Sequence, residues 1–143
     1  MAIFSPEDET AVRELLAKLE RPVELALVLG PEEQPVAGAR EIDFSGETRK
    51  VVEELVGLSE SLSLSVHEPP AFGAERFPAI AVLPEGEDVG IRYFGLPWGY
   101  ELGSLIGVCL DAGHREPSLR PESIERLATL ERDVSLEVFV TPT

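Results

Sequence analysis

Two neighbouring apolar segments in the middle of the chain constrain its fold most strongly. Residues 77–82 are apolar throughout and carry a proline at the second position, and residues 89–95 follow after a turn-rich linker. Short apolar runs bounded by proline and glycine predict strands, and the linker 84–88 suits an antiparallel hairpin. After Pro97 a helix is expected to run to Gly113, because apolar residues recur there at helical spacing: Leu102, Leu105, Ile106, Cys109 and Leu110.

The chain before this hairpin alternates between helical and strand patterns. Ser5 and Pro6 predict the start of a helix over 6–20, which Pro22 ends. A buried strand is expected at 23–29, a loop at 30–45, a helix at 45–61 started by Ser45 or Gly46, an alternating strand at 62–66 and a loop at 67–76. A strand–helix–strand crossover followed by the strands 79–83 and 91–94 predicts a small mixed α/β sheet flanked by helices.

The last 26 residues repeat the opening order of the chain. Residues 121–132 have the apolar spacing of an amphipathic helix, and residues 134–140 are apolar enough for a strand. The sequence therefore predicts one domain over 1–117 and an extra C-terminal helix–strand unit over 118–143. That unit has the helix-then-strand pattern expected at the start of a second domain.

Charge and cysteine content exclude several classes of function. The formal net charge of −15 disfavours nucleic acid and anionic membranes as partners. No basic-then-apolar leader opens the chain, and its only cysteine, Cys109, cannot form an intrachain disulfide, so the expected location is the cytoplasm. The absence of asparagine, with single Gln, Met and Cys residues, is thermophile-like.

A resemblance to a known family enters at residues 90–101, Gly-Ile-Arg-Tyr-Phe-Gly-Leu-Pro-Trp-Gly-Tyr-Glu. This segment resembles part of the first half of thermophilic protein disulfide oxidoreductases, which are tandem thioredoxin-fold proteins related to glutaredoxins. It is also similar to the N-terminal domain of the flavoprotein of alkyl hydroperoxide reductase. The resemblance implies a thioredoxin-like sheet. It also implies that residues 138–143, Val-Phe-Val-Thr-Pro-Thr, correspond to the run that leads into the Cys-x-x-Cys of the second fold in such proteins.

The sequence departs from the oxidoreductases at the place of their first dithiol. The corresponding residues 30–35 read Gly-Pro-Glu-Glu-Gln-Pro and contain no sulfur. Dithiol chemistry is therefore carried over to no residue of this chain, and the resemblance implies no catalytic residue and no cofactor. The hydroperoxide reductase domain likewise lacks its first pair.

The candidate site residues are Phe77, Pro78, Trp98 and Tyr100. The resemblance implies a cis bond between Phe77 and Pro78, which either lies against a partner peptide or only shapes the entry of the strand; the second reading is favoured. Trp98 and Tyr100 precede the clearest helix, where aromatic side chains either anchor a partner or pack against a neighbouring domain or the core; the second reading is favoured.

Other polar residues give no pattern of a catalytic or metal site. Cys109 lies on the apolar stripe of its helix and is expected to be buried and inert, although a lone reactive thiol is the alternative. His67 and His114 are far apart in sequence and lack the spacing of metal ligands, so surface positions are expected.

The sequence thus predicts a non-catalytic scaffold or docking domain of a disulfide oxidoreductase or peroxide-reductase electron-transfer system. Its expected partner is a protein or a second thioredoxin fold, and no disulfide reductase activity is expected of the chain by itself. The alternative is a self-contained homodimeric binding protein with no redox role. In that case two copies would associate through residues 119–143, because an unpaired apolar strand invites a partner strand.

Overall fold

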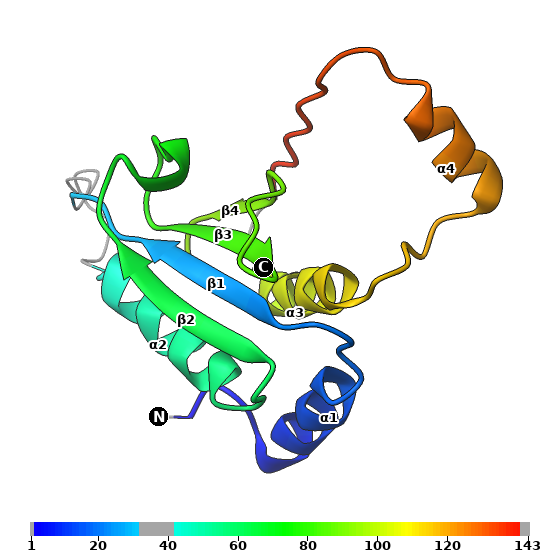
Figure 1. Ribbon diagram of the computed structural model, residues 1–143. Helices are drawn as coiled ribbons and strands as arrows, with labels where there is room; N and C mark the ends of the chain where they lie inside the picture. The colour runs from blue at the N-terminus through cyan, green and yellow to red at the C-terminus, as the bar shows by residue number, and fades with distance from the viewer. Residues whose placement is uncertain (1, 32–41, 141–143) are drawn as a thin grey trace.

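The computed structural model describes residues 2–31 and 42–140 of the chain (Figure 1). The elements follow in the order α1 (Pro6–Leu16), β1 (Val23–Val28), α2 (Phe44–Val56), β2 (Leu62–His67), η1 (Ala71–Gly73), β3 (Ala79–Pro84), β4 (Arg92–Phe94), α3 (Tyr100–Gly113) and α4 (Pro121–Ala128). None of the helices within these residues is long and apolar enough to cross a membrane.

The four strands form one mixed sheet in the order β2-β1-β3-β4. β1 runs parallel to β2, as a connection through α2 requires, and antiparallel to β3. β3 and β4 form the expected antiparallel hairpin, in which Ala79 pairs with Phe94. The chain therefore has the α/β thioredoxin-like fold that its sequence predicts.

The main core lies on one face of the sheet, between the strands and the helices. Alternate residues of the two central strands, from Val23 to Leu27 and from Ile80 to Val82, are fully buried there. α2 contributes Val52 and Leu55, and α3 contributes Leu105, Ile106 and Cys109. This packing follows from the apolar stripe of each helix facing the apolar row of each strand.

Among the described residues, no helix α1–α4 contributes to the groups packed on the opposite face of the sheet. Phe72 of η1 packs there against Ala26, Ala81 and Leu83. The same ring contacts the neighbouring group around Val28. Alanines at the centre of this face allow the η1 turn to lie close to the strands.

Several helix boundaries differ from the sequence expectation, and α2 ends at Val56 rather than near residue 61. α1 ends at Leu16 rather than near residue 20, because the chain turns at residues 17–21 and the N–H groups of Glu20 and Arg21 donate to the carbonyl of Gly113. α2 begins at Phe44 because the N-cap is Asp43, whose side chain accepts from the N–H of Gly46. The N-cap Ser5 of α1 is confirmed, since it accepts from the N–H of Asp8.

The C-terminal segment is where the sequence expectation was wrong. α4 ends at Ala128 rather than near residue 132, and residues 134–140 form no strand. A β-strand is stable only when a neighbouring strand takes up its backbone hydrogen bonds, and within the described residues 134–140 have no such neighbour. α4 stands away from the sheet and buries none of its residues (Figure 1).

Candidate docking surface beside cis-Pro78

Strands β1, β3 and β4 come together at one end of the sheet, and the candidate residues lie at this end. The last residue of β1, Val28, pairs with the first residue of β3, Ala79, which pairs with the last residue of β4, Phe94. Pro78 therefore lies beside the residues that follow β4. The N–H of Gly95 donates to the carbonyl of Pro78 over 2.8 Å, which fixes the two segments to each other.

Phe77 closes the space next to the end of β1. The Phe77–Pro78 peptide bond is cis, and Pro78 itself is buried. The Phe77 ring lies so close to Gly30 that a methyl group added at Gly30 would overlap it. Phenylalanine and glycine thus pack together where β1 ends, and the residues that follow, 32–41, lie outside the described part of the chain.

Aromatic side chains are exposed beside this closed site. Trp98 is 52% exposed and Tyr100 is 87% exposed, while Phe94 is 45% exposed. Gly99 has a φ of 59°, and its turn carries the chain from Trp98 into α3. The guanidinium carbon of Arg76 lies 5.9 Å from the centre of the Phe94 ring. These side chains could bind an apolar or aromatic group of another protein.

A partly buried tyrosine holds the start of α3 in place. The hydroxyl of Tyr93 on β4 donates to the Glu101 carboxylate over 2.8 Å. Burial and this carboxylate raise the pKa of Tyr93 well above its usual range, so the phenol stays protonated. The bond ties the first turn of α3 to the sheet and so positions the neighbouring Tyr100.

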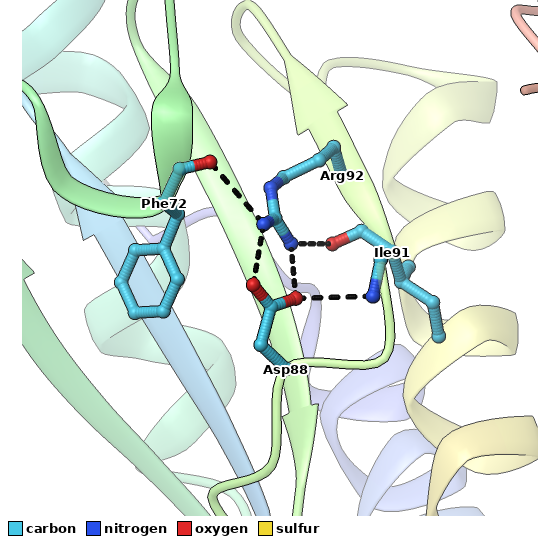
Figure 2. Close-up of polar contacts among 5 residues, drawn as sticks. Phe72, Asp88, Ile91 and Arg92 are labelled. Atoms are coloured by element: carbon cyan, nitrogen blue, oxygen red, sulfur yellow. Dashed lines mark hydrogen bonds and ion pairs between the residues drawn. The ribbon is translucent and has the colours of Figure 1, made fainter.

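A second set of contacts holds the loop that covers the other sheet face (Figure 2). Arg92 donates to both carboxylate oxygens of Asp88, over 2.8 and 2.7 Å, and to the carbonyl of Phe72 over 3.2 Å. Its guanidinium carbon also lies 5.5 Å from the centre of the Phe72 ring. The bonds from Arg92 and from the N–H of Gly90 lower the pKa of Asp88 to about 2. We call Asp88, Arg92 and Phe72 the arginine clamp.

The single thiol, that of Cys109, is not accessible to solvent in this structure. Cys109 is fully buried in the main core, and burial raises the pKa of its thiol to about 12. A nucleophilic cysteine needs an accessible thiolate, so the expectation of an inert core cysteine agrees with the geometry.

The two histidines lie apart and make separate local contacts. His67 on β2 hydrogen bonds with Ser65 over 2.8 Å and meets the Phe72 ring edge-on. His114 follows α3 and lies 3.3 Å from the Glu20 carboxylate. Across residues 2–31 and 42–140 no three His, Cys, Asp or Glu side chains come together as a metal site would require.

The structure gathers some of the candidate residues and reveals others. It places Phe77 and Pro78 at the end of the sheet where β3 begins, beside Gly95. Gly95 precedes Trp98 by three residues. The arginine clamp was not among the sequence candidates. Asp88 and Arg92 are separated by four residues in the hairpin, a signal that could have paired them, but nothing in the sequence marks the turn conformation of Phe72, whose φ is 54°.

Curated relatives of the chain are alkyl hydroperoxide reductase AhpF proteins, although no family model matches it. The chain is 33% identical over 109 residues to AhpF of Xanthomonas campestris pv. phaseoli, covering 74% of this chain and 20% of the relative. It is 28% identical over 132 residues to AhpF of Staphylococcus aureus strain Mu50, covering 92% of this chain and 23% of the relative. The chain thus spans about a fifth of the length of these relatives.

Solved structures show the same fold. The NTD_N/C domain of AhpF from Enterococcus faecalis superposes with a TM-score of 0.75 at 21% identity, over 90% of this chain and 62% of that one. A protein disulfide oxidoreductase from Aeropyrum pernix superposes with a TM-score of 0.70 at 22% identity, over 91% of this chain and 56% of that one. The chain is therefore a thioredoxin-fold protein that resembles the N-terminal domain of AhpF.

Proposed function

We propose that this chain is a non-catalytic thioredoxin-fold domain of a cytoplasmic disulfide-oxidoreductase or peroxide-reductase system, in which it positions a redox-active partner. Similarity to AhpF supports a place in such a system. The absence of a usable thiol carries the proposal that the domain does not itself transfer electrons. Its only cysteine is buried, and residues 30–35 contain none.

In this role the exposed aromatic side chains bind the partner. Trp98 and Tyr100 sit on a rigid base, because Gly95 is bonded to Pro78 and Glu101 to Tyr93. Aromatic residues held in fixed positions contribute strongly to protein interfaces at little entropic cost. The partner is a second thioredoxin fold that carries the Cys-x-x-Cys pair.

The first experiment tests for chemistry. The purified chain is incubated with dithiothreitol and a disulfide substrate, and the rate of reduction is compared with the uncatalysed rate. We expect no acceleration, because no thiolate is accessible at neutral pH. A rate well above the uncatalysed reaction that is lost when Cys109 is replaced by alanine would contradict the proposal.

The second experiment tests for the partner. The reading frame beyond residue 143 and the intact mass of the natural protein in its source organism show whether a Cys-x-x-Cys fold is joined to this one. Binding of that fold, as part of the protein or as a separate chain, is then measured for the double variant Trp98→Ala, Tyr100→Ala. We expect at least a tenfold weaker association, equivalent to about 1.4 kcal/mol. Leu15→Ala, which changes an exposed apolar residue on α1, is the control and should bind as wild type.

A further inference from the structure

The C-terminal end of α3 is closed by another part of the chain. Its last residue, Gly113, is followed by His114 and Arg115, and none of the three has the positive φ of the glycine that commonly ends a helix. The last carbonyl groups of a helix find no partner within the helix and need one from elsewhere. In α3 that partner is the connection between α1 and β1, residues 17–22.

This connection bonds to the last two carbonyl groups of α3. The Nε–H of Arg21 donates to the carbonyl of Ala112 over 2.8 Å. The backbone N–H groups of Glu20 and Arg21 both donate to the carbonyl of Gly113, over 2.9 and 3.2 Å. A guanidinium group at the C-terminal end of a helix also interacts favourably with the helix dipole. Residues 20 and 21 therefore cap α3 from outside the helix.

Close packing holds the connection against the same helix end. A Cβ atom added at Gly113 would overlap the side chain of Leu19, so a larger residue at 113 would push the two segments apart. Leu19 is partly buried and packs against the main core. Glycine is therefore needed at 113 for the close approach of a neighbouring side chain rather than for a left-handed turn.

The carboxylate of Glu20 extends the contact beyond the helix. One oxygen accepts from the N–H of Arg115 over 3.2 Å, and the other lies 3.3 Å from Nδ1 of His114. The Arg115 N–H, followed by His114, lowers the pKa of Glu20, so this carboxylate is ionised at neutral pH. The guanidinium of Arg115 also lies 3.6 Å from the carboxylate of Glu85, whose N–H donates to the carbonyl of Pro22 over 2.8 Å.

We propose that residues 19–21 form a clasp that fixes the direction in which the chain leaves α3, and that Glu20 is the residue that controls this direction. Arg21 closes the helix itself, whereas Glu20 holds the exit segment, which we define as residues 114–116. Among the described residues, removal of the Glu20 carboxylate leaves the exit segment one polar contact from another element, the pair of Arg115 with Glu85. Both side chains of that pair are exposed, and exposed ion pairs stabilise little.

The clasp makes the first part of the chain a determinant of the path of a later part. The connection joins α1 to β1, yet it sets where the residues after α3 begin. Pro117 follows the exit segment and restricts backbone rotation there, so a direction fixed at Arg115 is carried on to Ser118. This inference rests on these contacts alone, and it holds whether or not the redox role proposed above is correct.

The first test is amide hydrogen exchange of the 143-residue chain, followed by NMR at single residues. We expect the N–H of Arg115 to exchange faster by about threefold or more in Glu20→Ala than in wild type, because its acceptor is gone. Glu20→Gln keeps an oxygen acceptor but loses the charge, and should keep most of the protection. Glu14→Ala removes a carboxylate from an exposed position on α1, and its Arg115 should exchange as in wild type.

Two results of this test would overturn the proposal. One is unchanged exchange at Arg115 in Glu20→Ala. The other is an equal acceleration in Glu20→Gln, since the loss of charge alone would then account for the effect. The N–H groups of β1 should stay protected in every variant, because none of the substituted side chains belongs to the core.

The second test measures the direction itself. Spin labels are attached to Ser63→Cys, exposed on β2, and to Ser118→Cys, just after the exit segment; Cys109 is fully buried and is not labelled in the folded chain. The distances between the labels, measured by pulsed electron paramagnetic resonance, should form a narrow distribution in the wild-type background and a broader one in Glu20→Ala. Glu14→Ala should keep the narrow distribution. Equal widths with and without Glu20 would show that the clasp does not set the direction, and would overturn the proposal.

Discussion

Individual residues decide what this thioredoxin fold cannot do. The end of β1 is packed by Gly30 and Phe77, and the only thiol is buried among core side chains. Stability at this scale depends on close packing and on ion pairs such as that of Arg92 with Asp88. A substitution tests the packing of Gly30, acid tests the ion pair of Asp88, and alkylation tests the burial of Cys109.

Replacing Gly30 with alanine should destabilise the fold. The added methyl group would overlap the Phe77 ring, and overpacking of this kind costs about 1–3 kcal/mol. Gly103→Ala is the matched control, because a methyl group there meets nothing within 4 Å and lies in the interior of α3. The control should stabilise by about 0.5–1 kcal/mol. Chemical unfolding of both variants measures the difference, and an equal effect of the two would refute the close packing.

The arginine clamp should give the fold an acid-sensitive component. The pKa of Asp88 falls from 3.8 to about 2 in the folded protein, so its stabilisation is present above pH 3.8 and is lost as the pH falls through 2. Because the Asp88 side chain is 42% exposed, solvent screening limits this contribution to about 1 kcal/mol or less. Unfolding free energies between pH 5 and 2 should therefore decline less steeply in Asp88→Asn than in wild type; parallel slopes would be inconsistent with the pair.

Alkylation should separate the buried thiol from a reactive one. With its pKa raised to about 12, Cys109 in the native chain should react with iodoacetamide far more slowly than the same thiol in the denatured chain. Mass spectrometry over time follows the added group. Rapid modification of the folded protein at neutral pH would show that the thiol is accessible.

Secondary-structure elements were predicted from sequence where their own periodicity defines them. The strands at β1, β2 and β3 and the helix α3 lie within a few residues of their expected positions because apolar spacing and flanking prolines and glycines mark them. α2 begins one residue before the expected Ser45, because Asp43 is its cap. The prediction of a strand at 134–140 was wrong. An alternating apolar pattern shows that a segment suits a sheet, but it does not show that a neighbouring strand is present to pair with it.

The candidate site could be predicted only in part, because a local sequence pattern does not reveal contacts with distant segments. Phe77, Pro78, Trp98 and Tyr100 belong to one continuous stretch of strands and turn, so their likeness to known sequences located them. The arginine clamp joins η1 to the β3–β4 hairpin, and Phe72 is 20 residues from Arg92. Contacts between distant segments that depend on a left-handed turn have no local sequence signal.

η1 should prove as important to the sheet as a helix. Phe72→Ala removes the ring that covers Ala26 and Ala81 and should cost about 2–3 kcal/mol, less than a fully buried phenylalanine because Phe72 is only partly buried. Phe94→Ala is the control, since that ring is exposed on β4, and should cost less than about 1 kcal/mol. Thermal and urea unfolding measure both. Equal losses would mean that the second face of the sheet has another cover.

At the scale of the whole molecule, charge is the dominant property. A net charge of −15 on 143 residues creates self-repulsion that opposes the compact state. Raising the ionic strength from about 0.01 to about 0.15 M shortens the screening distance from about 30 to about 8 Å, so the melting temperature should rise. A variant with Glu14, Glu75 and Glu87 changed to glutamine should respond less to salt. A wild-type melting temperature that falls with salt would show that its ion pairs outweigh the repulsion.

The burial of Cys109 also bears on chemical durability. Peroxides attack sulfur first, converting accessible thiolates to sulfenic acids and methionine to its sulfoxide. This chain has one cysteine, enclosed in the core, and one methionine, at its first residue. A protein built this way keeps its shape in the presence of an oxidant that would inactivate a thiol enzyme, and its working lifetime is then set by unfolding rather than by oxidation.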